Sequence, residues 1–576
     1  MTAELLPARW FEKHFIRMLT SLGEPLDKEI ESVVAELISA TIMQHSCLDL
    51  SGRSDAFRDK LGRQSFVGGA GDHQPFVLED GRLYLNRFYN FEKEVAAMVM
   101  ARNQPVPFPG ELRQRLDELF SDEGQTLAAL LAVTRKLAVI TGGPGTGKTS
   151  TVVRILAILL DLRPDLAVRL AAPTGKAAMR LAESIRSSVT EIKSEHALLN
   201  EPEVVTLHRL LGMRHDGRSF RHGAENPVIA DLLIVDEASM IDLGLMHRLL
   251  QALPMDTCLI LLGDPNQLPS VDTGNVLADL CTRDPVFTHD FVDSVSGLVD
   301  HLEAVETSYG LANAVAHLTR SFRFDSDSGI GRLAEFVRDG TAPFSDSDDG
   351  TVTTTAPITE ADCGNILITI WDEYLQLLVD GCTDPIRLAR SFDRARVLCS
   401  HRKGFPGVEA INQAIEKELE RRALKAPDQA FYTGRPVLIT VNDYRLDLFN
   451  GDIGICFPGE PGEQLIAFPG TTGRVLLASR LPAHETCFAM TVHKAQGSEF
   501  EHVSLVLADA EGDDQLVSRE LVYTAVTRAR SSIALHSSAQ FWSRALAASS
   551  TRVSGMASFL GDDTQPPPET QLDLFT

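Results

Sequence analysis

The chain has 576 residues, of which 44% are hydrophobic and 23% charged, and this composition predicts several globular domains of a soluble protein. The formal net charge of −25 argues against a protein that coats nucleic acid over its whole surface, but it leaves room for a narrow basic channel inside an acidic shell. The eight scattered cysteines include no CxxC pair, which argues against zinc and iron–sulfur sites. There is no apolar run long enough to cross a bilayer and no signal-peptide pattern at the start, so we expect a cytoplasmic protein.

Residues 1–115 are expected to form a mostly helical region without recognisable chemistry. From about residue 116, apolar runs alternate with helical segments, which is the pattern of a parallel α/β sheet. The strands predicted in this first block are 137–140, 167–172, 231–237 and 257–264. Ligands in such folds gather at the carboxyl ends of the strands, so the polar residues there are site candidates.

A hairpin is predicted inside the first block, where the sequence GMRHDGRSFRHG occupies residues 212–223. It contains Asp216-Gly217, and this dipeptide is the strongest short hairpin signal. Further along, the polar and acidic segment 341–360 is expected to be a surface loop.

A second α/β block follows that loop. Its predicted strands are 395–400, 487–491 and 503–509. Short strands and an Asn450-Gly451 turn interrupt the block at 434–457, which suggests an inserted small barrel. Residues 556–576 are polar and rich in proline, so we expect a disordered tail.

A nucleotide site is predicted at residues 141–150, TGGPGTGKTS, which fit the pattern G-x-x-x-x-G-K-[ST] between a strand and a helix. Glycines let backbone N–H groups close around phosphates, and the helix dipole favours the negative charge. The expected nucleotide-binding residues are Gly142, Gly143, Pro144, Gly145, Thr146, Gly147, Lys148, Thr149 and Ser150. We expect Lys148 to reach the β- and γ-phosphates of ATP and Thr149 to ligate Mg²⁺. A chance glycine-rich turn is the competing interpretation, and the strand-to-helix context disfavours it.

Adjacent carboxylates, Asp236 and Glu237, end another predicted strand. In a catalytic interpretation Asp236 holds the metal, while Glu237 orients and deprotonates water. A solvated turn is the ordinary alternative for such a pair. Its position about ninety residues after the P-loop, on a second buried strand, favours the catalytic interpretation.

Two arginines are candidates for the cation that hydrolysis needs on the γ-phosphate: Arg323 and Arg528. Both lie in the second block, far in sequence from the P-loop. If both contact ATP, the nucleotide sits between two domains and its hydrolysis changes their separation, which is the geometry of a motor. A surface salt bridge would be the better interpretation of either arginine alone.

These motifs occur together in the order found in superfamily 1 helicases. They are TGGPGTGKT, APTGKAAMRL (172–181), TLHRLLG (206–212), LLIVDEASMID (232–242), LLGDPNQLPSVDTGNVLADL (261–280), SFRFDSDSGIG (321–331), TVHKAQGSEF (491–500) and VYTAVTRAR (522–530). Within that superfamily the chain resembles the RecD family, the alpha subunits of the bacterial RecBCD enzyme (exodeoxyribonuclease V). The likeness covers nearly the whole chain except residues 281–318 and the tail.

The resemblance implies two RecA-like P-loop domains, a small SH3-like β insert and a helical N-terminal domain. The implied divisions are 1–115, which would dock on RecC; 116–318, with a hairpin pin near 212–228; 319–433 with 483–555; 434–482 as the insert; and 556–576 as the tail.

The resemblance also implies activity. Proteins of the RecD type are ATP-driven helicases that move 5′→3′ along single-stranded DNA. They engage this strand at the ends of DNA duplexes. They form a heterotrimer with RecB and RecC that acts in double-strand-break repair, homologous recombination and degradation of linear DNA. The family places DNA cutting in RecB and recognition of the regulatory sequence in RecC, and no grouping of Asp, Glu and Lys in this chain suggests a nuclease site. Such a subunit would be cytoplasmic and associated with the nucleoid.

Further site residues follow from the same resemblance. Gln125 matches the glutamine that reads adenine, although an exposed glutamine at a helix start is a fair competitor. Gln267 matches the glutamine that senses the γ-phosphate. The candidate DNA-binding residues are Thr174, Thr206, His208, Asn450, Thr491 and His493, and for each a structural hydrogen bond is an equal alternative. Thr174 is expected to cap the helix that follows it, and the arginines of the 212–223 hairpin are expected either on DNA or on a plain surface.

The sequence ends in QLDLFT, which fits a peptide by which bacterial proteins dock on the DNA polymerase sliding clamp. The residues concerned are Gln571, Leu572, Leu574 and Phe575. A disordered tail presents such a peptide readily, and an ordinary C-terminus is the alternative.

Two other functions remain open at this stage. One is a free-standing RecD-like 5′→3′ helicase, which would act without RecB and RecC. The other is a P-loop switch or adaptor whose nucleotide state controls partner binding without movement, and the ordered motifs argue against it.

Overall fold

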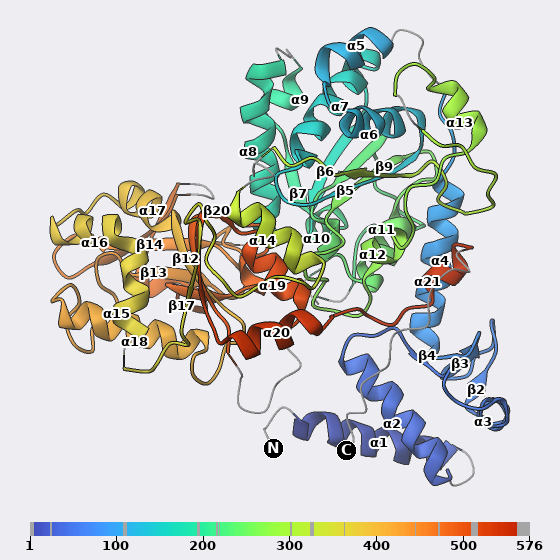
Figure 1. Cartoon of the computed structure of the whole chain (residues 1–576), viewed down its shortest axis with the longest axis horizontal. Coiled ribbons are helices and arrows are strands. Elements are labelled where there is room, and N and C mark those ends of the chain that lie inside the picture. The colour runs from blue at the N-terminus through green and yellow to red at the C-terminus, as the bar shows by residue number, and fades with distance from the viewer. Residues whose placement is uncertain are drawn as a thin grey trace.

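The computed structural model describes residues 5–22, 26–107, 112–192, 196–214, 217, 219–299, 302–322, 328–361, 363–443, 445–469, 473–508 and 517–561. They form two parallel sheets covered by helices, a small antiparallel β unit and an N-terminal region, which confirms the predicted α/β fold class (Figure 1). Within these residues no helix combines the length and the apolar sequence needed to cross a membrane.

The N-terminal region contains a sheet as well as helices. Its elements are α1 (Leu5–Leu22), α2 (Lys28–Ile42), β1 (Cys47–Asp49), α3 (Asp55–Gly62), β2 (Val67–Gly68), β3 (Phe76–Glu79), β4 (Arg82–Leu85) and α4 (Asn86–Arg102). The strands form one sheet in the order β1-β4-β3-β2. The prediction of a mostly helical region missed this sheet because strands of two to four residues are too short to show an alternating pattern.

The first parallel sheet has the order β10-β5-β9-β8-β6-β7. Its strands are β5 (Leu137–Gly142), β6 (Val168–Ala172), β7 (Val204–Thr206), β8 (Leu232–Val235), β9 (Cys258–Gly263) and β10 (Val315–Leu318). Its helices are α5 (Leu112–Leu119), α6 (Glu123–Thr134), α7 (Lys148–Leu162), α8 (Gly175–Ile192), α9 (Ala197–Asn200), α10 (Leu207–Leu210), η1 (Ala238–Met240), α11 (Leu243–Ala252), α12 (Val276–Leu280) and α13 (His289–Ser294). The four predicted strands are confirmed, and the prediction missed β7 and β10.

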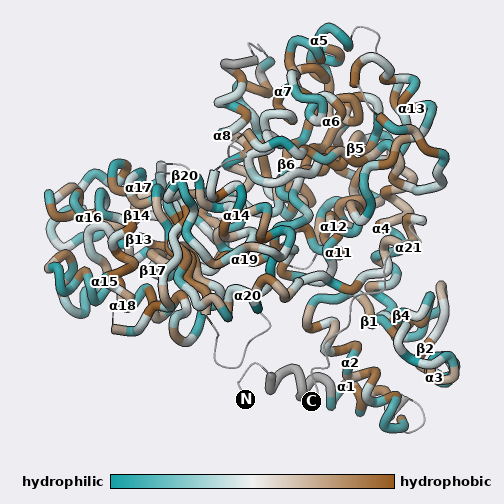
Figure 2. Tube along the Cα trace, in the orientation of Figure 1, coloured by the Kyte–Doolittle hydropathy of each residue, from teal (hydrophilic) through white to brown (hydrophobic). Residues whose placement is uncertain are grey.

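Alternation along the buried strands explains why both faces of this sheet are covered. On β5, Ala138 and Ile140 pack into the cluster that contains α6 and α7, while Leu137 and Val139 pack into the cluster that contains α11 and α4. A parallel strand with two buried faces reads as a continuous apolar run, and Figure 2 shows hydrophobic residues along these strands.

The second parallel sheet has the order β11-β20-β19-β12-β18. Its strands are β11 (Val352–Thr355), β12 (Ala395–Cys399), β18 (Ala489–Thr491), β19 (Phe500–Val506) and β20 (Ala529–His536). Its helices are α14 (Gly329–Arg338), α15 (Cys363–Ile368), η2 (Thr369–Trp371), α16 (Asp372–Val379), α17 (Pro385–Asp393), α18 (Val408–Arg421), η4 (His493–Ala495), α19 (Arg519–Val526) and α20 (Ala539–Ala547). The three predicted strands are confirmed. The prediction of a loop over 341–360 is wrong at β11, whose β-branched residues pair in parallel with β20.

The predicted β insert is a five-stranded antiparallel sheet. It consists of β13 (Pro436–Ile439), β14 (Ile453–Pro458), β15 (Gln464–Phe468), β16 (Arg474–Leu477), η3 (Ala478–Arg480) and β17 (His484–Thr486), with the strand order β16-β15-β14-β13-β17. β17 lies beyond the expected boundary at residue 482, because it pairs with β13 rather than with the parallel sheet.

After α20 the chain returns to the N-terminal region. Residues 548–561 run from the second sheet to α21 (Met556–Phe559), which packs against α4 (Figure 1). The prediction that disorder begins at residue 556 is therefore wrong for 556–561, since Met556 is fully buried. Residues 562–576, including the QLDLF peptide, lie outside the described residues.

Candidate nucleotide site and DNA-facing residues

The P-loop joins β5 to α7 in the conformation expected of a phosphate cradle. Gly145 and Gly147 adopt positive φ values of 76° and 79°, which a side chain would disfavour. A Cβ atom on Gly142 would lie 2.6 Å from Thr146 Oγ1 and 2.8 Å from the Leu318 carbonyl oxygen, so the loop packs too tightly for a larger residue. Because Gly147 is the N-cap of α7, the first backbone amides of the helix are available to an anion.

Lys148 lies inside this loop. Its Nζ donates to the carbonyl oxygens of Gly142, at 2.5 Å, and Gly143, at 2.9 Å. Thr146 Oγ1 also donates to the Gly143 carbonyl, at 2.9 Å. The ammonium group therefore sits where the loop amides and the helix N-terminus converge, which is the position that binding a triphosphate requires.

Gln125 lies beside the P-loop, at the start of α6. Its Nε2 donates to the Thr146 carbonyl at 3.3 Å, and its Oε1 accepts a hydrogen bond from Arg154 at 3.1 Å. The side chain is 3% exposed, so it is not the exposed glutamine that was the competing interpretation.

Asp236 and Glu237 follow β8 at the same edge of the sheet. Burial raises the pKa of Asp236 to about 6, the charge of Glu237 adds to the rise, and the positive charge of Lys148 opposes it. Glu237 has a φ of 53°, a left-handed conformation that costs about 1–3 kcal/mol for a non-glycine residue. The strained turn holds two carboxyl groups together near the P-loop lysine, and such strain is common at functional sites.

The loop after β9 connects the two parallel sheets. Asp264 Oδ2 accepts hydrogen bonds from Gln267 Nε2, at 3.2 Å, and from the hydroxyl of Tyr523 on α19, at 3.1 Å. The backbone N–H of Leu268 donates to Thr524 Oγ1 at 2.8 Å. A Cβ on Gly143 would lie 3.2 Å from the Tyr523 hydroxyl, so α19 also faces the P-loop. Sequence reasoning missed Asp264 and Tyr523, although both lie within the quoted motifs.

The two candidate arginines are placed differently. Arg528 is 3% exposed and donates to the Thr524 carbonyl, the Ser498 carbonyl and Thr527 Oγ1, and these three bonds lie within the second block. Arg323 lies outside the described residues.

The residues just before Arg323 do contact the P-loop. The Phe322 N–H donates to the Gly145 carbonyl at 2.7 Å, and Ser321 Oγ donates to the Pro144 carbonyl at 3.4 Å. The described chain therefore reaches the phosphate loop through Ser321 and Phe322.

Several candidate DNA-binding side chains have structural partners. Thr174 Oγ1 accepts from the Ala177 N–H at 3.2 Å, which confirms the predicted cap on α8. Thr206 Oγ1 accepts from the Arg209 N–H at 3.3 Å, and Thr491 Oγ1 from the Lys494 N–H at 3.4 Å. These hydroxyls satisfy helix-start amides, whose neighbours stay available to a backbone phosphate.

The remaining candidates are two separate histidines and an asparagine. Burial lowers the pKa of His208 and of His493, so both rings favour the neutral form. The N–H of Asn450 donates to Asn442 Oδ1 at 2.8 Å. The neighbouring Phe449 packs on Gly175. A Cβ atom built on Gly175 would lie 3.6 Å from the Phe449 side chain. The structure thus brings the chain neighbours of Asn450 and Thr174, Phe449 of the β insert and Gly175 of the first block, into contact.

The start of α8 also contacts the second block. Arg180 donates to the Gly497 carbonyl at 2.9 Å and forms a 3.3 Å ion pair with Glu499. The predicted hairpin is described in part: Met213 and Phe220 form an antiparallel bridge, and Phe220 lies 6.1 Å from the His208 ring.

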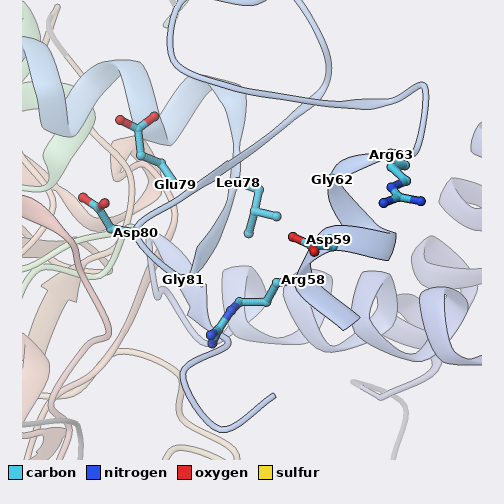
Figure 3. A pocket seen from close by; sticks show the side chains of 8 residues that line it. All are labelled: Arg58, Asp59, Gly62, Arg63, Leu78, Glu79, Asp80 and Gly81. Carbon is cyan, nitrogen blue, oxygen red and sulfur yellow. The ribbon is translucent and has the colours of Figure 1, made fainter. Parts of the chain in front are cut away.

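A pocket of about 520 Å³ lies elsewhere, between α3 and the β3–β4 turn. Its lining includes Arg58, Arg63, Glu79 and Asp80 but none of the predicted site residues, and the charged groups point in different directions (Figure 3). Within the described residues no cluster of three or more His, Cys, Asp or Glu side chains is arranged to hold a metal ion.

Known proteins resemble this chain along most of its length. The family described as AAA domain matches residues 125–273, and the UvrD-like helicase C-terminal domain matches residues 486–535. The RecBCD enzyme subunit RecD of Haemophilus influenzae is 33% identical over 531 residues, which cover 85% of this chain and 81% of that protein. The RecBCD enzyme subunit RecD of Mycobacterium tuberculosis is 36% identical over 492 residues, 83% of this chain and 80% of that protein.

More distant similarities were also found. The ATP-dependent RecD2 DNA helicase of Deinococcus radiodurans is 30% identical over 483 residues, which cover 81% of this chain but 57% of that protein. Among solved structures, the Pif1 helicase from Bacteroides in complex with ADP-AlF3 and ssDNA aligns with a TM-score of 0.37 at 17% identity, covering 76% of this chain and 94% of that one.

The bond between Tyr523 and Asp264 leads to a first prediction. Replacing Tyr523 with phenylalanine leaves the ring but removes the hydroxyl that joins α19 to the loop after β9. We expect the kcat of nucleotide hydrolysis to fall by roughly 5- to 30-fold, the equivalent of about 1–2 kcal/mol. Tyr374→Phe is the matched control, because its buried hydroxyl bonds the Gly434 carbonyl within the second block. Equal kcat values for the two variants would contradict the importance of the contact.

Proposed function

This chain belongs to the RecD family of ATP-dependent DNA helicase subunits, and we propose that it is the 5′→3′ single-stranded-DNA motor of a RecBCD-type helicase–nuclease. One observation carries the proposal: the P-loop edge of the first sheet is bonded to the second block, through Phe322 and through Tyr523. A nucleotide in that seam contacts both blocks, so its hydrolysis changes contacts in both of them. We assign 116–318 to the first RecA-like domain and 319–433 with 487–555, the segment after β17, to the second.

The residues at the seam suit ATP and Mg²⁺. The positive-φ glycines and Lys148 form the phosphate cradle, while Thr149 and Asp236 supply the oxygen ligands that Mg²⁺ prefers. Bound Mg²⁺ neutralises negative charge on the phosphates. Glu237 then orients and deprotonates the attacking water, and we assign the reading of adenine to Gln125.

The γ-phosphate is sensed from the loop after β9. Gln267 is bonded to Asp264, and Asp264 is bonded in turn to Tyr523 of α19. A shift of Gln267 is therefore transmitted to the second domain through Asp264. Arg323 and Arg528 supply positive charge in the transition state. For Arg528 this requires a further closure that releases it from its present carbonyl partners.

DNA is proposed to lie across both domains and the β insert. Thr174, Thr206, His208, Asn450, Thr491 and His493 line this path, where helix-start amides and hydroxyls meet backbone phosphates. The contact between Phe449 and Gly175 supports the path, because it joins the insert to the first domain beside two of these residues. The 5′→3′ direction comes from membership of the family.

The partners are proposed to be RecB and RecC, with residues 1–115 docking on RecC, in the cytoplasm and on nucleoid DNA. Sequence identity favours a subunit over a solitary helicase, since the two RecD subunits are 33% and 36% identical to this chain and the RecD2 helicase is 30% identical. Gln571, Leu572, Leu574 and Phe575 are proposed to contact the sliding clamp.

Purification from the native cell tests the motor proposal. We expect RecB and RecC to co-purify with the chain, and the complex to need its ATPase to unwind DNA from a 5′ tail. Lys148→Gln removes the phosphate-binding ammonium, so ATP hydrolysis and 5′-tailed unwinding by this subunit should fall by at least about 10³-fold. A chain that elutes alone and unwinds 5′-tailed duplexes is a solitary helicase. One without DNA-stimulated ATPase is a switch.

The raised pKa of Asp236 predicts competition between protons and Mg²⁺. At pH 7.5 this carboxyl is mostly ionised, whereas below about pH 6 it is mostly protonated and must lose its proton to bind metal. We therefore expect the Mg²⁺ concentration for half-maximal ATP hydrolysis to rise by about fourfold between pH 7.5 and pH 5.5, with high Mg²⁺ restoring the rate. An Mg²⁺ requirement that does not change with pH would contradict the assignment.

Clamp binding is tested separately. Pull-downs with purified sliding clamp should recover the full chain but lose it when the chain ends at Glu569, since the truncation removes the peptide and leaves α21 in place. The clamp proposal fails if both proteins bring down the same amount.

A further inference from the structure

The segment after α20 joins three parts of the molecule. It leaves the second sheet, passes the loop after β9 and ends beside α4 (Figure 1). The Val553 carbonyl accepts from Ser46 N–H and Oγ, at 3.1 and 3.0 Å, and Ser554 Oγ donates to Glu92 at 2.9 Å. These bonds fasten residues 549–561, here called the strap, to the N-terminal region.

Arg552 of the strap binds the loop after β9. Its NH1 donates to the carbonyls of Gly274, at 2.6 Å, and Asp272, and to Ser270 Oγ at 3.2 Å. Its NH2 donates to the Ser270 carbonyl and to the side-chain oxygen of Gln44. Five hydrogen bonds from one guanidinium thus gather the end of the loop and the N-terminal region around a single side chain.

Besides Arg552, the segment 270–274 is held by α11, because the Leu243 N–H donates to the Thr273 carbonyl at 3.0 Å. Residues 270–274 belong to no helix or strand, and Gly274 has a φ of 93°. Ser270 Oγ bonds the Asp272 and Gly274 carbonyls, and the Gly274 N–H donates to the Gln44 carbonyl at 3.0 Å. The carbonyls that Arg552 gathers converge on one point, where a planar cation with several donors satisfies them together.

The other end of the same loop carries the nucleotide sensor. Asp264 and Gln267 precede the Arg552-bound residues by a few positions, and Leu268 between them is fixed by Thr524 and by Gln496 Nε2, which donates to its carbonyl at 2.8 Å. The loop is therefore anchored to α19 near its start and to Arg552 at its end. Loss of the Arg552 bonds would weaken the second anchor and allow the end of the loop to shift relative to Leu268.

We propose that Arg552 is a positioning residue for ATP hydrolysis. It holds the loop 264–274 so that Asp264, with Gln267 bonded to it, contacts α19 in the geometry needed for DNA-stimulated turnover. The inference rests on the proposed motor function. It also makes the geometry of the sensor depend on the N-terminal region, because Gln44 shares the same guanidinium.

The test uses the full chain with ATP and oligo-dT as the DNA. Arg552→Ala should lower the DNA-stimulated kcat by about tenfold or more, with the KM for ATP changed less than about twofold. Arg552→Lys keeps the charge without the planar fork and should recover part of the loss. Ser46→Ala is the matched control: it removes a bond from the strap to the N-terminal region without touching the loop, and kcat should stay within about twofold of the parent.

A double-mutant cycle separates positioning from general support. If Arg552 acts through Gln267, then adding Arg552→Ala to Gln267→Ala should lower kcat by less than about twofold, because the sensor is already lost. If Arg552→Ala does not fold, the cycle is measured with Arg552→Lys, and the same non-additivity is expected. Additive losses, or an equal loss in Ser46→Ala, would overturn the inference. A parent protein without DNA-stimulated ATPase would overturn the motor function itself, before any variant is compared.

Discussion

The contact between α19 and the loop after β9 is the constraint on which the rest of the site depends. It has two bonds of different kinds: a tyrosine hydroxyl on the buried Asp264 carboxyl, and a backbone amide of Leu268 on the Thr524 hydroxyl. Asp264 is 1% exposed, so each donor that reaches it replaces lost water, and breaking one leaves a buried charge less well solvated. The two sheets are therefore tied together at the residues that face the P-loop.

Burial shapes the electrostatics of the nucleotide site, where it raises the pKa of the Asp236 carboxyl. Asp236 is held against Glu237 by a strained turn, and the positive charges of Lys148 and Arg180 oppose the rise in its pKa. Arg180 is also paired with Glu499 of the second block, so the two carboxyl groups share one ammonium and a guanidinium that is already engaged. The site is thus electrostatically incomplete by itself, which suits a place where metal and triphosphate arrive together and are later released.

Much of this arrangement was predictable from sequence, because its signals are local. A glycine pattern between a strand and a helix fixed the P-loop, and continuous apolar runs marked β5, β8, β9 and β12. What was not predictable depends on contacts between distant segments. Tyr523 meets Asp264 across 259 positions, and β17 joins the insert only by pairing with β13. The prediction missed short strands such as β2 and β11 for another reason. A strand of a few residues shows no clear alternation of apolar and polar residues, and its conformation depends on the strands it pairs with.

The path of the strap adds a physical reason for the N-terminal region to matter to the motor. A surface region attached by one linker would move independently, but here Arg552, Ser554 and Val553 all bond residues of the first 92 positions. Arg552 is partly buried, and burial lowers its pKa to about 10 while nearby aspartates raise it, so the guanidinium remains charged at neutral pH. A buried cation surrounded by carbonyls tolerates little displacement, since each lost acceptor leaves charge poorly solvated. The strap therefore ties the second sheet to the N-terminal region beside the loop after β9.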